Sequence, residues 1–281
     1  MPGRAEDGCM EVPQPVPVAQ HLAVLEPAAL PVLRATHAAI AHWAARSDEV
    51  DASRLADIAL RDPLMCLRML QHVAATLGRR LQTPVQTVTA ALVLTGIEPF
   101  FRAFRDLPVL EDRFAAHPAG LHGVLAAVTR AHAAARISVA FAVHRQDDDV
   151  ELLHQAALLH DFPELLLWCV APDAALELAR LRRQEPQMAD GEAERQVLGG
   201  ELAAVGQALL QRWELPASLC EAARALDMHG PAALNVRLAV QIAHHLQDGW
   251  QHPALAEDFR QAGLLLNLPP AGVASLVRHA L

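Results

Sequence analysis

Apolar residues recur along the chain at the spacing of one face of a helix. No segment shows the strict alternation of apolar and polar residues that a half-buried β-strand would require. Proline, acidic or hydroxyl residues precede many of the apolar runs, where they favour the start of a helix. The predicted helices begin near residues 31, 52, 63, 84 and 98 in the first part of the chain, and in the second part they cover residues 122–144, 150–169, 173–184, 192–213, 217–228, 231–249, 254–265 and 271–280. The sequence therefore predicts an all-α protein.

The helical pattern is interrupted by two proline-containing segments. Residues 1–17 are rich in proline and have few apolar residues, so we expect a disordered tail there. A second interruption lies near residues 105–121. We therefore expect a two-part helical bundle, with an N-terminal helical subdomain at residues 18–120 and a larger one at residues 121–281.

Composition and charge exclude several classes of function. The chain carries 23 basic residues, all of them arginine, against 32 acidic residues, for a formal net charge of −9. Because duplex nucleic acid is bound through a basic face, we expect no nucleic-acid partner. The four cysteines form no CxxC pair, as is usual in a reducing compartment, and the first residues lack the apolar segment of a signal peptide. No uncharged apolar run of about 18 residues is present, so we expect a cytoplasmic protein without a membrane partner.

A few of the 15 histidines form a candidate site with an aspartate. His160 and Asp161 lie together in the apolar run AALLHDFPELLLW, where an unpaired charge would cost several kcal/mol. A tight turn at residues 146–149 would make two helices antiparallel. His132, on the first of them, would then lie at a similar height to His160 and Asp161 on the second. With His244, these residues are a candidate metal site, since imidazole and carboxylate ligands suit divalent ions that activate water for phosphoester hydrolysis. The alternative is structural: Asp161 accepts hydrogen bonds from a helix N-terminus or an arginine and locks the bundle.

The order of several motifs resembles a known family. A first histidine, a gap near 28 residues and the sequence ALLHD are similar to the HD superfamily of metal-dependent phosphohydrolases. The segments LPVL, VDASRLADIALRDPLMCLRMLQHVAA and TPVQTVTAALVLTGIEPFFRAF resemble the paired helices of the HDOD domain, the HD-related output domain of bacterial signalling proteins. GGELAAVGQALLQRWELP is similar to a later segment of that family. The resemblance covers about residues 25–265 and implies an HD-like fold for the C-terminal subdomain.

The resemblance also assigns metal ligands to positions in this chain. His132 matches the first histidine, the histidine–aspartate pair matches the dyad, and His244 stands where the family has a closing aspartate. Leu202 replaces the histidine of a His-x-x-Val-Gly motif, and only His229 remains of a downstream histidine pair. The GYP-type segment of relatives that degrade cyclic di-GMP is absent. This set implies at most one weakly held divalent metal, and we expect no cofactor and no catalytic residue.

Three functions follow from these observations. The first is a non-catalytic HDOD signal-transduction module that binds signalling proteins or a small ligand at the junction of the bundles. The second is a metal-dependent phosphohydrolase acting on a nucleotide or cyclic dinucleotide with a reduced ligand set. The third is a helical scaffold in which the histidine–aspartate cluster is purely structural. We favour the first, because the hydrocarbon side chain of Leu202 cannot bind a metal.

Three closely spaced phenylalanines form a second feature of interest. Phe100, Phe101 and Phe104 follow the turn Gly-Ile-Glu-Pro. We expect them to pack in the core between the two bundles. A groove that docks a partner is the alternative, since aromatic residues dominate interface hot spots.

Overall fold

The chain folds into α-helices, as predicted. The computed structural model describes residues 17–26, 30–78, 85, 87–215 and 230–281. Within these ranges the structure contains helices and one isolated parallel bridge, between Val32 and Val109, but no strand. The all-α prediction is therefore confirmed. Almost all of the predicted tail and the predicted helix at residues 217–228 lie outside the described residues.

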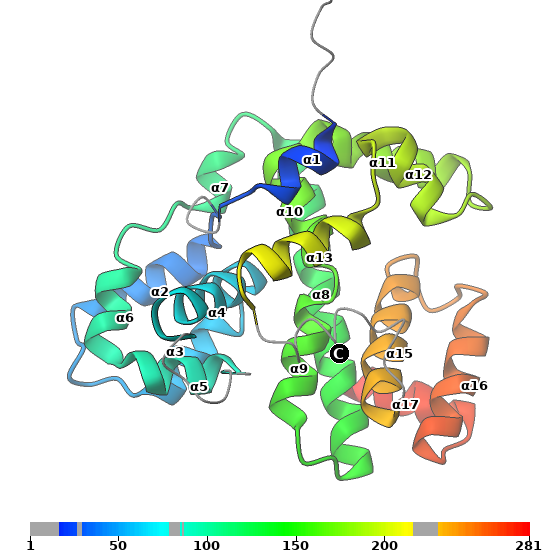
Figure 1. The fold of residues 1–281 in the computed structure, drawn as a ribbon. Helices are drawn as coiled ribbons and strands as arrows, with labels where there is room; N and C mark the ends of the chain where they lie inside the picture. The colour runs from blue at the N-terminus through cyan, green and yellow to red at the C-terminus, as the bar shows by residue number, and fades with distance from the viewer. Residues whose placement is uncertain (1–16, 27–29, 79–84, 86, 216–229) are drawn as a thin grey trace, which may run out of the picture.

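The helices are drawn in Figure 1, which gives their arrangement. In chain order they are α1 (Val18–Ala23), α2 (Arg34–Ala44), α3 (Ala52–Ala59), α4 (Pro63–Leu77), α5 (Val88–Thr95), α6 (Ile97–Ala103), α7 (Leu110–Arg113), α8 (Pro118–Arg145), α9 (Val150–Leu159), α10 (Phe162–Val170), α11 (Pro172–Gln184), α12 (Asp190–Leu198), α13 (Leu202–Arg212), α15 (Pro231–Leu246), α16 (Leu255–Leu266) and α17 (Pro270–Ala280).

Two of the predicted helices are each divided in two. The helix expected at 150–169 ends at Leu159 and restarts as α10, because Pro163 lacks the N–H that would continue the hydrogen-bond ladder. The helix expected at 192–213 is divided at Gly199, which has φ 74° and ends α12 in the left-handed conformation. The helix α1 had not been predicted.

Side chains pack into two apolar clusters, and both α8 and α9 contribute residues to each of them. The N-terminal half of α8, including Val124, joins the first cluster with α1–α7 and α10–α13. Its C-terminal half, including Phe141, joins the second cluster with α9 and α15–α17. In Figure 1, α2–α6 lie on one side of α8 and α15–α17 on the other. The predicted boundary at residues 120 and 121 falls in the first turn of α8.

The three phenylalanines lie in the first cluster. The side chains of Phe100, Phe101 and Phe104 are all buried. The ring of Phe100 lies 5.4 Å from that of Phe101 and 5.1 Å from that of Phe104, between centroids. These residues therefore pack in a core, as we expected, but α6 lies at the outer edge of the N-terminal helices in Figure 1, away from the second cluster.

Two glycines allow the helices around α10 to approach closely. A Cβ at Gly123 of α8 would lie 2.3 Å from the ring of Trp168, and one at Gly206 of α13 would lie 2.7 Å from Cγ of Pro163. Any larger residue at these positions would force the neighbouring side chain to move. The two contacts hold α10 between α8 and α13, and so fix the position of its first residues.

One helix of the described residues, α8, is long and apolar enough to span a membrane by length and composition. Of its most apolar stretch, 56% is buried inside the structure. Packing against neighbouring helices therefore accounts for its hydropathy.

Candidate functional site

The histidine–aspartate pair lies at the break between α9 and α10, opposite α8. The turn after Arg145 makes α8 and α9 antiparallel, and Ser138 Oγ donates a hydrogen bond to the carbonyl of Leu153 at 3.3 Å. Arg130 precedes Ser138 by as many residues as Asp161 follows Leu153. Arg130 and Asp161 are therefore expected to face each other. The Nε atom of Arg130 accordingly lies 3.7 Å from Oδ2 of Asp161.

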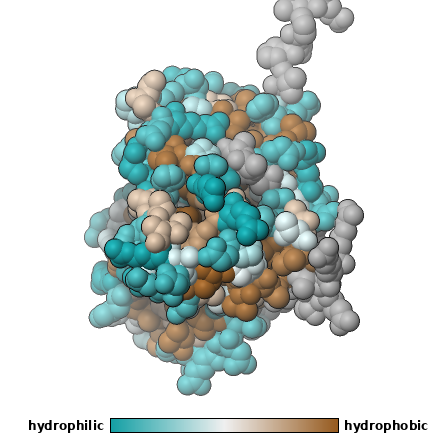
Figure 2. Space-filling view, turned by 90° about the vertical axis from the view of Figure 1, so that its left-hand side faces the viewer, coloured by the Kyte–Doolittle hydropathy of each residue, from teal (hydrophilic) through white to brown (hydrophobic). Residues whose placement is uncertain are grey.

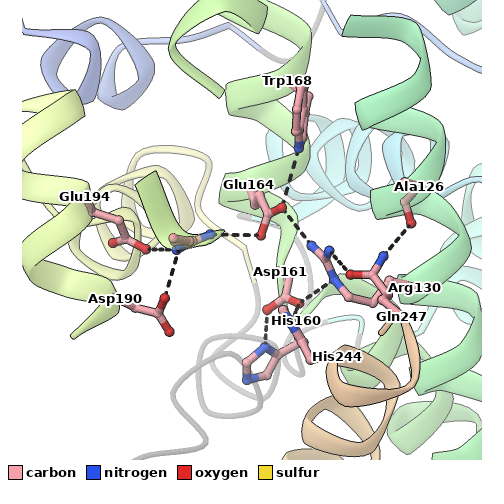
Figure 3. Close-up of polar contacts among 11 residues, drawn as sticks. Ala126, Arg130, His160, Asp161, Glu164, Trp168, Asp190, Glu194, His244 and Gln247 are labelled. Carbon is pink, nitrogen blue, oxygen red and sulfur yellow. Dashed lines mark hydrogen bonds and ion pairs between the residues drawn. The ribbon is translucent and has the colours of Figure 1, made fainter. Parts of the chain in front are cut away.

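Both oxygens of the Asp161 carboxylate are held by histidines (Figure 3). The Nδ1 atom of His160 lies 2.7 Å from Oδ1, and the Nε2 atom of His244, on α15, lies 2.6 Å from Oδ2. An ionised carboxylate only accepts hydrogen bonds, so the proton of each bond is on the imidazole nitrogen. Asp161 therefore joins α15 to the start of α10.

Glu164, one turn further along α10, is the second carboxylate of the site. Its Oε1 atom lies 2.8 Å from Nη2 of Arg130 and accepts a 3.4 Å hydrogen bond from the indole of Trp168. Its Oε2 atom lies 3.9 Å from Nη1 of Arg182. Arg130 also donates to Oε1 of Gln247, the C-cap residue of α15, at 2.8 Å. The guanidinium of Arg130 thus contacts both α10 and α15.

Arg182 extends the network to α12 and α13. Its guanidinium lies 3.0 Å from Asp190 and 2.7 Å from Glu194. The other oxygen of Glu194 accepts a 2.8 Å hydrogen bond from the backbone N–H of Leu202. Burial raises the pKa of Glu194, and these partners only partly oppose the shift. One chain of polar contacts therefore connects six helices (α8, α10, α11, α12, α13 and α15).

Hydrogen bonding at Asp161 decides the charge of the dyad. Burial alone would raise the pKa of Asp161, but the bonds from His160 and His244 hold it well below its usual range. Burial lowers the pKa of His160, and the bond to Asp161 outweighs that effect, so the net shift is upward. For Arg130, burial is likewise outweighed by Glu164 and Asp161, and its pKa is raised. The site therefore favours an ionised Asp161 beside the cation of Arg130.

The profile of the HDOD domain matches residues 30–228, which is more than two thirds of the chain. The chain belongs to the HDOD family. The resemblance inferred from the sequence motifs is confirmed, and the HD-like helical fold expected for an HDOD protein is the one observed.

Two solved structures resemble this HDOD protein over most of its length. The MmoQ response regulator from Methylococcus capsulatus has a TM-score of 0.64 at 23% identity and covers 88% of this chain and 97% of its own. A virulence factor from Campylobacter jejuni has a TM-score of 0.62 at 18% identity, with coverages of 94% and 100%. At these identities the likeness shows a shared fold. No curated protein matches the chain in sequence.

The structure brings together three of the residues that the HDOD resemblance pointed to. His160, Asp161 and His244 are in direct contact. His132 lies on a different side of α8, where its Nε2 atom is 3.0 Å from the carbonyl oxygen of Arg61 and where burial lowers its pKa. His229 lies outside the described residues. The metal-ligand roles of these residues remain predictions.

The sequence interpretation missed Arg130 and Glu164. Consecutive residues of a helix are about 100° apart, so Arg130 and His132 face nearly opposite directions. The buried residues Ala127, Ala134 and Ile137 lie three, four and seven positions from Arg130, on its own side of α8. This periodicity identifies position 130 as facing the core, and it could have directed attention to Arg130.

These residues do not fit the divalent ion that the resemblance to HD hydrolases implies. Both oxygens of Asp161 are already hydrogen-bonded, and the permanent cation of Arg130 lies beside them. The side chain of Leu202 is 7% exposed and belongs to the first apolar cluster. In the part of the chain that the structure describes, no three His, Cys, Asp or Glu side chains are placed to hold a metal ion.

The paired histidine makes stability depend on pH. Because the pKa of His160 is raised from 6.5 on folding, its contribution is present below pH 6.5 and is lost as the pH rises through the raised value. The pKa of Asp161 is lowered from 3.8, so its contribution is present above pH 3.8 and is lost at more acid pH. We expect urea unfolding of His160→Gln to show a flatter decline in stability from pH 6.5 upward, whereas His279→Gln, at an exposed position, should keep the wild-type slope. An unchanged slope in His160→Gln would contradict this assignment.

Proposed function

We propose that this HDOD protein is a non-catalytic regulatory module that acts by binding a signalling protein or a small ligand. The observation that carries the proposal is the guanidinium of Arg130, whose Nε lies 3.7 Å from Asp161 and whose Nη2 lies 2.8 Å from Glu164. These contacts make the dyad part of an internal network of ion pairs. Its carboxylates then serve to hold helices together.

Electrostatics explains why this arrangement opposes metal-dependent hydrolysis. The side chain of Arg130 is 9% exposed, and that of Asp161 is 25% exposed, so water screens their interaction only in part. A divalent ion at Asp161 would have to displace hydrogen-bonded histidines and approach a fixed positive charge. The affinity of the site for metal is therefore expected to be low.

The name of one structural relative agrees with a regulatory role. MmoQ is called a response regulator. We propose by analogy that the partners of this chain are signalling proteins, and that it acts in the cytoplasm of a bacterial cell. The polar network offers a route for such control, because it connects α15, in the second apolar cluster, to α10–α13, in the first.

Metal content and hydrolysis test the proposal directly. We expect protein purified without chelator to contain far less than one equivalent of manganese, iron or magnesium. It should not cleave nucleotides or cyclic dinucleotides when these metals are added. The matched variant Asp161→Asn keeps the shape of the side chain and removes its charge, so any turnover that depends on the dyad would disappear in it. Stoichiometric metal together with phosphodiester cleavage lost in Asp161→Asn would overturn the proposal in favour of a hydrolase.

A further inference from the structure

A cleft of about 480 Å³ lies between α2 and α6. None of its lining residues belongs to the Arg130 network. Its apolar lining includes the buried side chains of Ile40, Phe101, Phe104 and Leu107. Figure 2 views the molecule from the side of these helices and shows hydrophilic side chains around a hollow in which apolar side chains are visible. The cleft is within the range of volumes that hold small organic ligands.

Three basic side chains (His37, Arg102 and Arg105) and one carboxylate, that of Glu98, also line this cleft. Neither arginine has an ion pair with any residue that the structure describes. Glu98 is the helical neighbour four residues before Arg102, but its carboxylate accepts a 2.7 Å hydrogen bond from the hydroxyl of Ser47 instead. In contrast, the exposed Arg34, at the start of α2, lies 2.5 Å from Asp112.

Other arginines of the described residues, such as Arg180 and Arg183, also have no ion pair. Arg102 and Arg105 differ from them in position, because both line the cleft beside its apolar side chains. A guanidinium binds carboxylate, sulfonate or phosphate oxygens through two parallel hydrogen bonds, and apolar lining stabilises a hydrocarbon body by removing it from water.

We propose that this cleft binds a small organic anion that has an aromatic or branched apolar body. The apolar body packs against Phe101, Phe104 and Leu107, and the anionic group pairs with Arg102 and Arg105. The proposal adds a ligand class to the regulatory function proposed above. It rests on that function only for the consequence of binding, because the cleft and the Arg130 network share no residue.

The experiment compares two fluorescent probes of nearly the same shape. Anilinonaphthalene sulfonate carries a negative charge, N-phenylnaphthylamine does not, and both become brighter in an apolar site. We expect the sulfonate to bind saturably at one site with an affinity that falls as salt is added. The uncharged probe is expected to bind at least about tenfold more weakly, because it cannot pair with a guanidinium.

Variants of the full chain assign the site. The double variant Arg102→Gln, Arg105→Gln should weaken sulfonate binding about tenfold or more and leave the uncharged probe unaffected. The control Arg180→Gln, Arg183→Gln removes two exposed arginines at the same spacing on α11 and should bind as the wild type does. Ala41→Phe, at an exposed position that lines the cleft, should block both probes by filling it.

Two results would overturn the cleft proposal. One is equal affinity for the two probes, and the other is sulfonate affinity that survives both the paired arginine variant and Ala41→Phe in protein that still has its wild-type circular dichroism spectrum. Neither result bears on metal content or hydrolysis, so failure of the cleft proposal is distinguishable from failure of the proposed regulatory function.

Discussion

Replacement of Arg130 by methionine is expected to lower the free energy of unfolding by about 3 kcal/mol. Methionine preserves much of the length of the side chain, so the loss arises mainly from charge. The substitution leaves the carboxylates of Asp161 and Glu164 without their shared cation while both remain largely shielded from water, with side-chain exposures of 25% and 18%. It also removes the hydrogen bond to Gln247 that links α8 to α15. Urea or guanidinium unfolding measures the difference.

A control and a double variant separate charge from packing. Arg136→Met, at an exposed position on the same helix, should change stability by less than about 0.5 kcal/mol. Adding Glu164→Gln to Arg130→Met should recover part of the loss, because it removes one of the two carboxylate charges that lose Arg130. A loss at Arg130 no larger than that at Arg136 would show that the network contributes little to stability. The proposal that it joins the helices would then be wrong.

The sequence predicts the helical fold because each helix carries its own local signals. Asp51 and Asp62 begin α3 and α4, and Gly96 ends α5, at the positions that capping preferences indicate. The helix break at His160 and Asp161 was missed because the surrounding apolar residues are buried on both sides of it. Periodicity cannot distinguish one buried helix from two short ones that meet at an angle. Pro163 was the available sign of the break.

The candidate site was predictable only in part, for a geometric reason. The dyad and His244 could be found from residue type and family pattern, and they are in contact. The residue opposite them on α8 depends on the register of two antiparallel helices, where a shift of two residues reverses the side that faces the partner. That register is set by the turn after Arg145, and it selects Arg130 in place of His132.

Replacement of a different buried aspartate, Asp62, is expected to lower the free energy of unfolding by a similar amount. Asp62 is fully buried at the start of α4. Its Oδ1 atom accepts hydrogen bonds from the backbone N–H groups of Leu64 and Met65 at 3.0 and 3.2 Å, and its Oδ2 atom accepts one from Leu33 at 2.7 Å. It therefore caps α4 and also holds the residue that precedes α2.

We expect Asp62→Ala to lower the free energy of unfolding by about 3–5 kcal/mol, because two buried N–H groups and one partly buried N–H group would lose their acceptor. Burial raises the pKa of Asp62, so the carboxylate itself is costly to hold in the core. Removing the carboxylate recovers part of the free energy spent on burying it. The decrease in the free energy of unfolding is therefore smaller than the sum of the three hydrogen bonds. Asp51→Ala is the matched control: this exposed cap accepts one bond, from Arg54 at 2.8 Å, and its loss should cost about 1 kcal/mol. Equal losses in the two variants would mean that the bond to Leu33 adds nothing. Apolar packing alone would then fix the start of α2. Because α2 forms one wall of the cleft, the same packing would also fix that wall.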